Sequence, residues 1–479
     1  MDALNRRHFM QTTLAAAATV TVAGTKSSAR VRGANDTIRV AVAGLNGRGS
    51  AHIDGFAGQK GVQVVCVVDP DTRTFNKRIK QVEKKGGNTP RVEQDIRKAL
   101  EDKSIDAISI ATPNHWHALM TIWGCQAGKD VYVEKPCSHN VHEGRIAVEM
   151  ARKHNRIVQH GTQSRNSLAW AQIAAVVRSG KLGRLLISRA LCYKPRNSIG
   201  VKPNSPAPRE VDFNLWLGPA AQRDFNGNLV HYNWHWFWDF GNGDIGNQGV
   251  HQMDIARWMI PGATLPTSVI SLGGRFGYKD QGETPNTQLA FMEFDKTLLT
   301  FEVRGLKTDD LRGEKVGNIL HLEAGVIAGN RFYPQGSSEA QPLPKVDVAG
   351  TRGPGSSIFA NFIASVRSRK VQDLNADILD GHYSSALGHL ANISYRLGED
   401  AAFPARVSSL GDNKDVLDTI ERMQEHLSIG NKIDLKTIQC RMGRKLKIDP
   451  KTESIVGDKA ASKLLTRDYR KGFEVPAKV

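Results

Sequence analysis

The sequence has few cysteines, no long apolar run and no internal repeat, and each shortage excludes a class of protein. Five Cys among 479 residues, none in a Cys-x-x-Cys pair, are too few and too scattered for a disulfide framework or a zinc ribbon. The apolar run Leu14–Gly24 is far shorter than the ~20 residues that cross a bilayer. What remains, with 40% hydrophobic and 24% charged residues, is typical of a folded globular chain of two or three domains.

The positive charge is concentrated at the two ends of the chain. The net charge is +17, and residues 1–35 and 431–479 carry a large part of that excess. Nucleic-acid binding would need basic and aromatic residues interleaved on one compact face. We therefore expect no nucleic-acid partner, and a basic exterior that favours solubility or anionic surfaces.

The first residues have the pattern of an export signal. Arg6 and Arg7 precede the short, mildly apolar run and then a small, polar stretch. This order predicts a twin-arginine signal over residues 1–32, hence the export machinery as a partner and a periplasmic or otherwise exported location. An ordinary amphipathic N-terminus is the alternative. Because this pathway carries folded proteins, a cofactor could be loaded before export.

From residue 36 the pattern alternates between strand and helix. Short, nearly continuous β-branched runs separated by helices imply a parallel sheet covered on both faces. We expect helices from the turn at residue 49 to about 57, and over 72–84, 115–127 and 141–154. The expected strands are Ile38–Ala43, Val62–Val68, Ile105–Ala111, Val131–Glu134 and Ile157–His160.

After about residue 161 the rhythm changes to strands with fewer helices. Strands are expected over 185–193, 267–272, 288–294, 298–303 and 319–323, with helices over 168–179, 358–367 and 383–397. The predicted fold class is α/β. It combines an N-terminal Rossmann doubly wound parallel sheet with a second α+β domain on an open, largely antiparallel sheet. The predicted limits are 36–162 and 163–410, followed by a basic, mostly irregular extension over 411–479.

A glycine-rich turn lies between the first strand and the first helix. It reads Gly44-Leu45-Asn46-Gly47-Arg48-Gly49, and the second strand ends at Asp69. Small residues at a helix N-terminus let a backbone approach a pyrophosphate, and an acid there binds ribose hydroxyls and repels a 2′-phosphate. The pattern predicts a dinucleotide site with NAD favoured over NADP, contacted by Asn46, Gly47 and Arg48. Asn46 stands where the usual fingerprint has its second Gly. A tight structural turn is the alternative.

Three further motifs follow at separate places in the chain. Thr112-Pro113-Asn114-His115-Trp116-His117 and Glu134-Lys135-Pro136 each follow a predicted parallel strand, and Gly246–Trp258 contains Asn247 and His251. Ligands bind at the carboxyl ends of such strands. Together, in this order, the motifs resemble the Gfo/Idh/MocA oxidoreductases, the family of glucose–fructose oxidoreductase and inositol dehydrogenase. The resemblance covers residues 36 to about 400.

The resemblance implies roles for these residues. Thr112, Pro113, Asn114, His117 and Glu134 would contact the cofactor. Lys135 would stabilise a developing alkoxide and His251 would act as general base. Asn247 stands where relatives have Asp, so Asp244 or Asp254 is a candidate for the missing charge. A surface Lys and a structural His are the alternatives for Lys135 and His251.

An aromatic segment precedes the His251 motif. Trp faces with polar tips suit a sugar ring, and the alternatives are a core cluster or a subunit interface. The candidate substrate contacts are Tyr232, Trp234, His235 and Trp236, with Gln163, Arg165 and Asp254 elsewhere. A metal site from His231, His235, Asp239 and His251 matches no standard ligand spacing, so no metal is expected.

These observations lead to an expected function. The leading hypothesis is an exported NAD-dependent oxidoreductase that transfers hydride between a sugar hydroxyl and a tightly held nicotinamide. One alternative is an NAD-dependent glycosidase that oxidises, eliminates, hydrates and reduces back. Another is a non-catalytic sugar-binding or nucleotide-binding protein, which Asn247 would favour. By resemblance, the chain is expected to form a dimer or tetramer.

Overall fold

The computed structural model describes residues 37–348, 350–403 and 411–479. The predicted export signal over residues 1–32 lies outside the described residues. In the described part, none of the helices has the length and apolar character that a membrane crossing requires. All five Cys are buried free thiols.

The first sheet consists of six parallel strands in the order β3-β2-β1-β4-β5-β6, the doubly wound arrangement that the sequence predicted. Its strands are β1 (Ile38–Ala43), β2 (Val62–Val68), β3 (Arg91–Glu93), β4 (Ala107–Ile110), β5 (Asp130–Val133) and β6 (Val158–His160). Strand β3 was not predicted from the sequence. It is a three-residue edge strand with charged residues at both ends, so it has no apolar run to reveal it.

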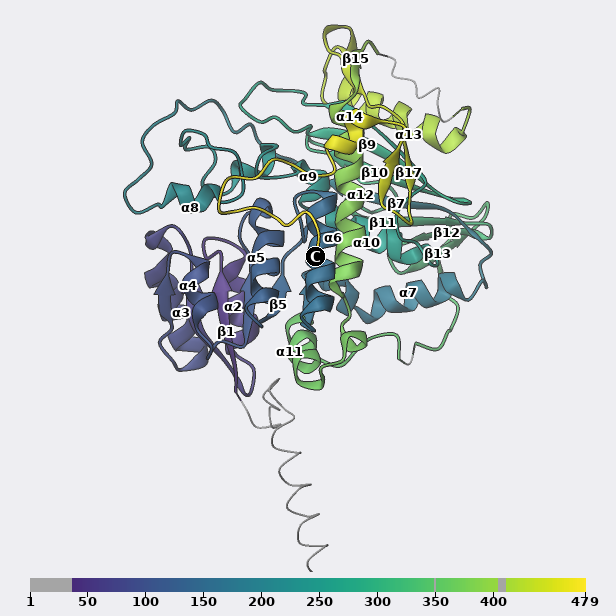
Figure 1. Ribbon diagram of the computed structural model, residues 1–479. Helices are drawn as coiled ribbons and strands as arrows, with labels where there is room; N and C mark the ends of the chain where they lie inside the picture. Colours follow the sequence, from purple (N-terminus) through teal and green to yellow (C-terminus); the bar gives the residue numbers. More distant parts are fainter. Residues whose placement is uncertain (1–36, 349, 404–410) are drawn as a thin grey trace, which may run out of the picture. The chain divides into compact units, whose positions relative to one another are not determined.

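Helices cover both faces of this sheet, as Figure 1 shows. Apolar side chains of α5 and α6 pack on one face, and those of α2, α3 and α11 pack on the other. The helices are α2 (Gly49–Ala57), α3 (Phe75–Gly86), α4 (Ile96–Glu101), α5 (Asn114–Gln126), α6 (Val141–Lys153) and α11 (Ile358–Ser368). The chain therefore returns to the first sheet some 200 residues after leaving it, since α11 buries Phe362 against that sheet.

The second sheet has twelve strands and is largely antiparallel, as predicted. Among its described pairs, β7 and β10 run parallel. The strands are β7 (Leu185–Tyr193), β8 (Ser268–Gly274), β9 (Thr287–Phe294), β10 (Thr297–Arg304), β11 (Val316–Leu322), β12 (Gly325–Ala328), β13 (Arg331–Pro334), β14 (Gln341–Pro342), β15 (Glu399–Ala401), β16 (Cys440–Met442), β17 (Leu446–Asp449) and β18 (Ser454–Val456). The associated helices are α7 (Leu168–Arg178), α8 (Phe213–Leu217), α9 (Gly243–Gly246), α10 (Gly249–Met259), α12 (Ile378–Arg396), α13 (Lys414–Glu425) and α14 (Lys459–Lys463).

The last 69 residues are more regular than the sequence suggested. Strands β16 and β17 pair with β8, and α13 packs Ile420 and Met423 on the sheet near Phe291. The chain then runs back to the first sheet, where Phe473 packs edge-on against Trp116. Short alternating strands at a sheet edge gain their order from the neighbouring strand, and this neighbour lies far away in the sequence.

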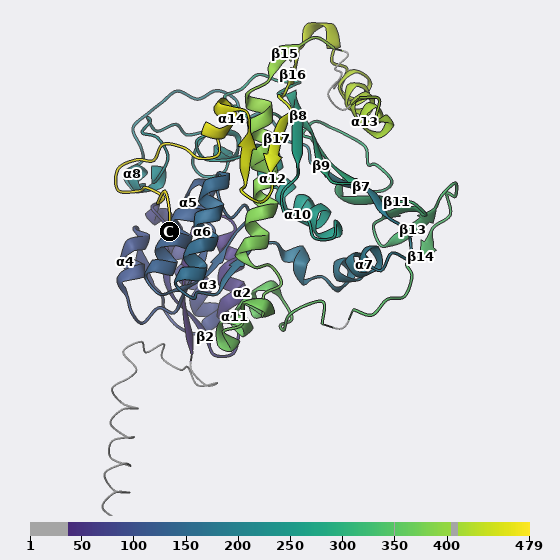
Figure 2. The ribbon, with the colours of Figure 1, turned by 45° about the vertical axis from the view of Figure 1, so that its right-hand side comes forward.

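The long helix α12 joins the two sheets. It contacts α6 of the first half and both α10 and β8 of the second, and it passes between them in Figures 1 and 2. Its N-cap Asp377 accepts a hydrogen bond from the Leu379 amide. This packing holds α9 and α10 beside the carboxyl end of β5, where the Glu134-Lys135-Pro136 motif lies.

Candidate active site

One cavity of about 350 Å³ lies at the carboxyl ends of β1, β2, β4 and β5. In the strand order, β1 and β4 flank the point where the winding direction reverses, which is the usual ligand position in such sheets. Lys135, Asn247 and His251 line the same cavity as the Gly44 turn. The structure thus brings together the residues on which the sequence hypothesis depended.

The glycine turn has two glycines fixed by packing and one that leaves space. A Cβ on Gly44, whose φ is +86°, would lie 2.5 Å from backbone atoms of Ala111, and one on Gly49 would lie 2.0 Å from the Gly44 carbonyl oxygen. Gly47 lines the cavity and has nothing within 4 Å of a Cβ position. Gly49 is therefore needed for the turn and does not line the cavity. Gly47 leaves space for a ligand to approach the backbone, which is the role of the second fingerprint Gly that Asn46 replaces.

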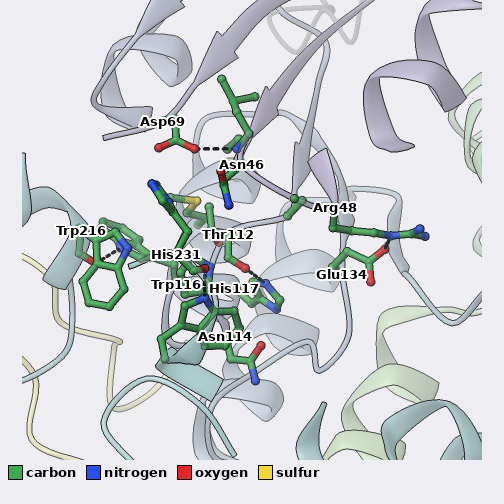
Figure 3. A pocket seen from close by; sticks show the side chains of 18 of the residues that line it. Asn46, Arg48, Asp69, Thr112, Asn114, Trp116, His117, Glu134, Trp216 and His231 are labelled. Carbon is green, nitrogen blue, oxygen red and sulfur yellow. Dashed lines mark hydrogen bonds and ion pairs between the residues drawn. The ribbon is translucent and has the colours of Figure 1, made fainter. Parts of the chain in front are cut away.

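Asp69 faces the turn with its carboxylate already anchored. Its two oxygens accept hydrogen bonds from the Leu45 amide at 2.7 Å and the Asp71 amide at 2.9 Å, and Figure 3 shows the first of these. Burial raises the pKa of Asp69 to about 6, against the opposing effect of these two donors. Each oxygen keeps a further lone pair, so the group can still accept from a ribose hydroxyl.

A segment from the second half of the chain covers this end of the cavity. Residues 208–240, here termed the cover segment, contribute Leu215, Trp216 and His231 to the lining. His231 Nε2 lies 2.7 Å from an Asp71 carboxylate oxygen. The Thr72 amide donates to the Glu210 carbonyl at 3.0 Å, which fixes the start of the segment to the end of β2. Sequence reasoning had no signal for this role, since nothing local links residues 210–216 to β2.

In the motif after β4, some polar side chains already have hydrogen-bond partners within the protein and others can still bind a ligand. His117 lines the cavity, but its two ring nitrogens lie against carbonyl oxygens of Pro136 and Thr112. Thr112 Oγ1 is buried without a hydrogen-bond partner and lies in the lining. Asn114 Nδ2 donates to Asn242 Oδ1 at 3.4 Å. We conclude that His117 supports the loop, and that Thr112 and the Asn114 amide oxygen have capacity for a ligand.

Glu134 is held as a carboxylate in the middle of the lining. Its Oε1 accepts from Arg48 Nε at 2.7 Å and lies 3.1 Å from His52 Nε2 (Figure 3 shows the Arg48 pair). Burial alone would raise the pKa of Glu134, but the hydrogen bond with His52 and the charges of Arg48 and Lys135 hold it well below its ordinary value. Arg48 itself lines the cavity and also holds Glu134 in place there.

Lys135, Asn247 and His251 form the other end of the cavity. Lys135 Nζ donates to Asn247 Oδ1 at 3.0 Å and to the Asn247 carbonyl at 3.1 Å. Burial lowers the pKa of Lys135, while Glu134 opposes that shift. Burial, followed by the Lys135 charge, lowers the pKa of His251 to about 3, so its imidazole is neutral at neutral pH and is a weaker base than a free imidazole.

The two carboxylates considered as substitutes for the missing Asp are both engaged elsewhere. Asp244 forms a two-pronged ion pair with Arg196, with 2.8 Å between Nε and Oδ2. Asp254 forms another with Arg165, at 2.8 and 2.9 Å. Asp244 raises the pKa of Lys135 only through its longer-range field. The position at which the resemblance implies an Asp is thus filled by an uncharged amide.

The predicted sugar contacts divide into two groups. Gln163, Tyr232, Trp234 and His235 line the cavity. His235 stacks on Trp234 with ring centroids 3.6 Å apart, and its Nδ1 contacts the Tyr232 carbonyl at 2.6 Å. The structure does not bring Trp236, Arg165 or Asp254 to the lining: Trp236 is buried beneath Arg196, and the other two pair with each other.

Metal coordination finds no support in the described residues. They contain no group of three or more His, Cys, Asp or Glu placed to hold an ion. The remaining polar lining residues that sequence reasoning missed are Gln94 and Asp95, at the start of α4. Because α4 follows the missed strand β3, these residues could not be placed without the sheet order.

Comparison with known proteins agrees with both halves of the fold. Residues 38–162 match a family model described as "Oxidoreductase family, NAD-binding Rossmann fold", and residues 172–271 match one described as "Oxidoreductase family, C-terminal alpha/beta domain". A Glycosyl hydrolase family 109 protein of Shewanella pealeana is 30% identical over 210 residues, covering 39% of this chain and 45% of that protein. The scyllo-inositol 2-dehydrogenase (NAD(+)) of Bacillus subtilis is 32% identical over 148 residues, covering 31% and 42%. The chain thus matches less than half the length of these curated relatives.

Solved structures share the fold at low sequence identity. The WlbA dehydrogenase of Bordetella pertussis, in complex with NADH and UDP-GlcNAcA, superposes with a TM-score of 0.55 at 18% identity, covering 74% of this chain and 96% of that one. A levoglucosan dehydrogenase in complex with NADH and levoglucosan gives a TM-score of 0.53 at 16% identity, covering 74% and 97%. These likenesses establish the arrangement of a Rossmann domain followed by an α/β domain.

Proposed function

Since the chain belongs to the Gfo/Idh/MocA oxidoreductase family and carries its NAD-binding Rossmann domain, we propose that it is an exported, NAD-dependent oxidoreductase of a sugar or sugar derivative. It transfers hydride between a carbohydrate carbon that bears a hydroxyl and a tightly held nicotinamide. The observation that carries the proposal is the single cavity that joins the Gly44 turn to Lys135 and His251. Related dehydrogenases that act on inositol and sugars support the substrate class.

The lining suits NAD along its length. The open Gly47 and the start of α2 fit a pyrophosphate, because amide groups at a helix N-terminus favour negative charge. Asp69 fits a ribose, and Thr112 Oγ1 is a buried hydroxyl that needs a partner. Glu134 and Lys135 would then flank the nicotinamide, which supplies hydride acceptance at its ring when bound.

The residues at the reacting end can handle the hydroxyl proton. His251 lines the cavity in the neutral form that a general base requires, and its imidazole would take that proton as the carbon loses hydride. Lys135 can donate a hydrogen bond to the same oxygen and stabilise its developing negative charge. Asn247 holds Nζ in place through its Oδ1 without adding a counter-charge. Trp234 and Tyr232 offer an aromatic edge to the sugar, and Gln163 offers an amide.

The cover segment supports tight retention of the cofactor. It is fixed at the end of β2 and also at α5, where Trp116 Nε1 donates to the Leu215 carbonyl at 3.1 Å. A Cβ on Gly218 would lie 2.2 Å from the Trp116 ring, so the two elements are in close contact. The core of the segment is a cluster of buried aromatic and aliphatic residues that includes Trp216 and Phe240. A dinucleotide could leave only after these contacts opened.

The first experiment identifies the cofactor and then the reaction. The purified protein is denatured and the released nucleotide is identified by mass spectrometry, with NAD expected. The native protein is then mixed with a panel of sugars while the absorbance of reduced nicotinamide is followed. Lys135→Met should lower the response by at least about 100-fold, whereas Lys181→Met, exposed and outside the lining, should not. Unchanged turnover in Lys135→Met would refute the assignment.

A second candidate is a glycosidase that uses NAD without net oxidation. The Shewanella relative named as a glycosyl hydrolase favours it. A keto group formed at the same cavity would acidify a neighbouring C–H, so a glycosidic oxygen could leave before water adds and hydride returns. Release of a chromogenic phenol from aryl glycosides, dependent on NAD and on Lys135, would favour this cycle over net oxidation.

The proposed function also includes export of the folded protein and its assembly into an oligomer. We propose that the twin-arginine signal carries the folded, cofactor-loaded protein out of the cytoplasm, because no nicotinamide pool exists outside. Replacing Arg6 and Arg7 by Lys should retain the protein in the cytoplasm, as fractionation would measure. We further propose a dimer or tetramer formed through the second sheet, which light scattering of the purified protein tests.

A further inference from the structure

A second cavity, of about 570 Å³, lies on the far side of Asn242 from the active site. It is bounded by the loop after β5, the end of the cover segment, α12 and the C-terminal chain around α14, which runs beside α12 in Figures 1 and 2. Asn242 separates the two cavities: its Oδ1 accepts from Asn114, and its Nδ2 donates to the His139 carbonyl at 3.1 Å. None of the proposed catalytic residues lines this second cavity.

Two imidazoles in its lining each have a buried ring nitrogen without a protein partner. Arg467 Nη1 lies 3.3 Å from His139 Nδ1, so Nδ1 must accept and the proton is on Nε2. That Nε2–H is buried and has no acceptor. His389, which is 4% exposed, contacts Ser138 through Nε2 and has no partner at Nδ1. Burial lowers the pKa of both groups, that of His389 to about 3, so both are neutral.

The amide side chains of the lining are occupied by the protein. Asn392 Nδ2 donates to the Asn242 carbonyl at 2.9 Å, and Asn140 Nδ2 donates to Glu143 at 2.8 Å. These amides therefore have a structural role in the lining, and a ligand would be recognised by other groups. A buried N–H without a protein acceptor is costly, so an oxygen acceptor in the polar cavity beside it would be favoured.

The charged groups around the cavity are mostly donors without acidic partners. Arg396, Lys463 and Arg467 form no ion pair among the described residues, and Arg396 lies over the Trp238 ring at 5.2 Å. Two carboxylates also reach the lining: Asp239, which pairs with Arg223 at 3.4 Å, and Asp468 on the exposed rim. Three cationic groups thus face two carboxylates, of which Asp239 is already paired and Asp468, like Lys463, is exposed. Arg467 Nη1 also donates to the Asp239 carbonyl at 2.8 Å, so a ligand would bind the other nitrogens of that guanidinium.

We propose that this second cavity is a binding site for a small oxyanionic ligand, a carboxylated or phosphorylated sugar. Arg467 and Arg396 would bind the oxyanion, His139 Nε2–H would donate to a further oxygen, and Trp238 offers an aromatic surface to the ring. The cavity volume is sufficient for one monosaccharide. The site does not depend on the redox proposal, since its occupancy is measured without turnover.

The test is calorimetric titration of the full chain with glucuronate, glucose 6-phosphate, inorganic phosphate and glucose. Glucuronate or glucose 6-phosphate should bind at least tenfold more tightly than glucose, and the two anionic sugars show whether carboxylate or phosphate is preferred. Arg396→Met should weaken that binding at least tenfold, and Lys463→Met should weaken it severalfold. Lys459→Met, on the same helix but outside the lining, is the matched control and should bind as the parent chain does.

Three results would overturn the proposal. One is that neither anionic sugar binds more tightly than glucose. Another is that Arg396→Met and Lys463→Met bind like the control. The third is that phosphate alone binds as tightly as either sugar, which would mean an adventitious ion only. Should Arg396→Met fail to fold, the imidazole N–H resonance of His139 in the parent chain gives the second readout, and a shift on adding glucuronate is expected.

Discussion

Replacing Asn247 by Asp should raise the pKa of Lys135, because it places a carboxylate where an uncharged amide now accepts the Nζ hydrogen bond. The Nζ–Oδ1 distance is 3.0 Å. At that separation two unit charges attract by about 5.5 kcal/mol with an effective dielectric constant of ~20. Burial of the new carboxylate offsets part of this, so the expected rise is ~1–3 pKa units, or about 1.4–4 kcal/mol. Asn and Asp have nearly the same shape, so the fold should be retained.

The assay follows the amine directly. Lysines are reductively methylated with ¹³C, which preserves their charge, and the Lys135 resonance is assigned by its loss in Lys135→Met. Its titration is then compared between the parent chain and Asn247→Asp, with Asn233→Asp, outside the lining, as the control. In the parent chain the pKa lies below the ordinary value because of burial. If Lys135 titrates at the same pH in the parent chain and in Asn247→Asp, the residue at position 247 does not control the pKa of Lys135 and the reasoning is refuted.

Three other predictions concern stability and the turn. Glu302→Gln removes a fully buried carboxylate that faces three arginines, and it should lower the free energy of unfolding by about 3–5 kcal/mol, seen as an earlier urea midpoint. Burial raises the pKa of Glu143 to about 7, so the free energy of unfolding should fall as pH rises from about 4.5 through 7. In urea titrations at a series of pH values, Glu143→Gln should make this free energy depend less steeply on pH, and an unaltered pH dependence would contradict the prediction. Gly44→Ala should destabilise the fold by several kcal/mol, since its Cβ would meet backbone at 2.5 Å, whereas Gly47→Ala should unfold like the parent chain and bind NAD more weakly.

The sequence determined the parts of this protein that depend on neighbours along the chain. The run Ile38–Ala43 followed by the Gly44 turn indicated a buried strand and a dinucleotide turn, because strand burial and turn conformation follow from adjacent residues. The motif with Lys135 was placed correctly at a strand end for the same reason. Asp69 follows β2 and lines the cavity, as the strand pattern indicated, although its two backbone donors were not foreseen.

Tertiary structure decided the pairings between distant residues. Arg165 and Asp254 were expected at the substrate, but they neutralise each other across 89 positions of sequence. Arg196 likewise forms an ion pair with Asp244, so this carboxylate does not replace the negative charge that Asn247 lacks. The cover segment lies over β2 only because the second half of the chain folds back onto the first. Such contacts depend on which surfaces the two sheets bring together, and a one-dimensional pattern carries no record of that juxtaposition.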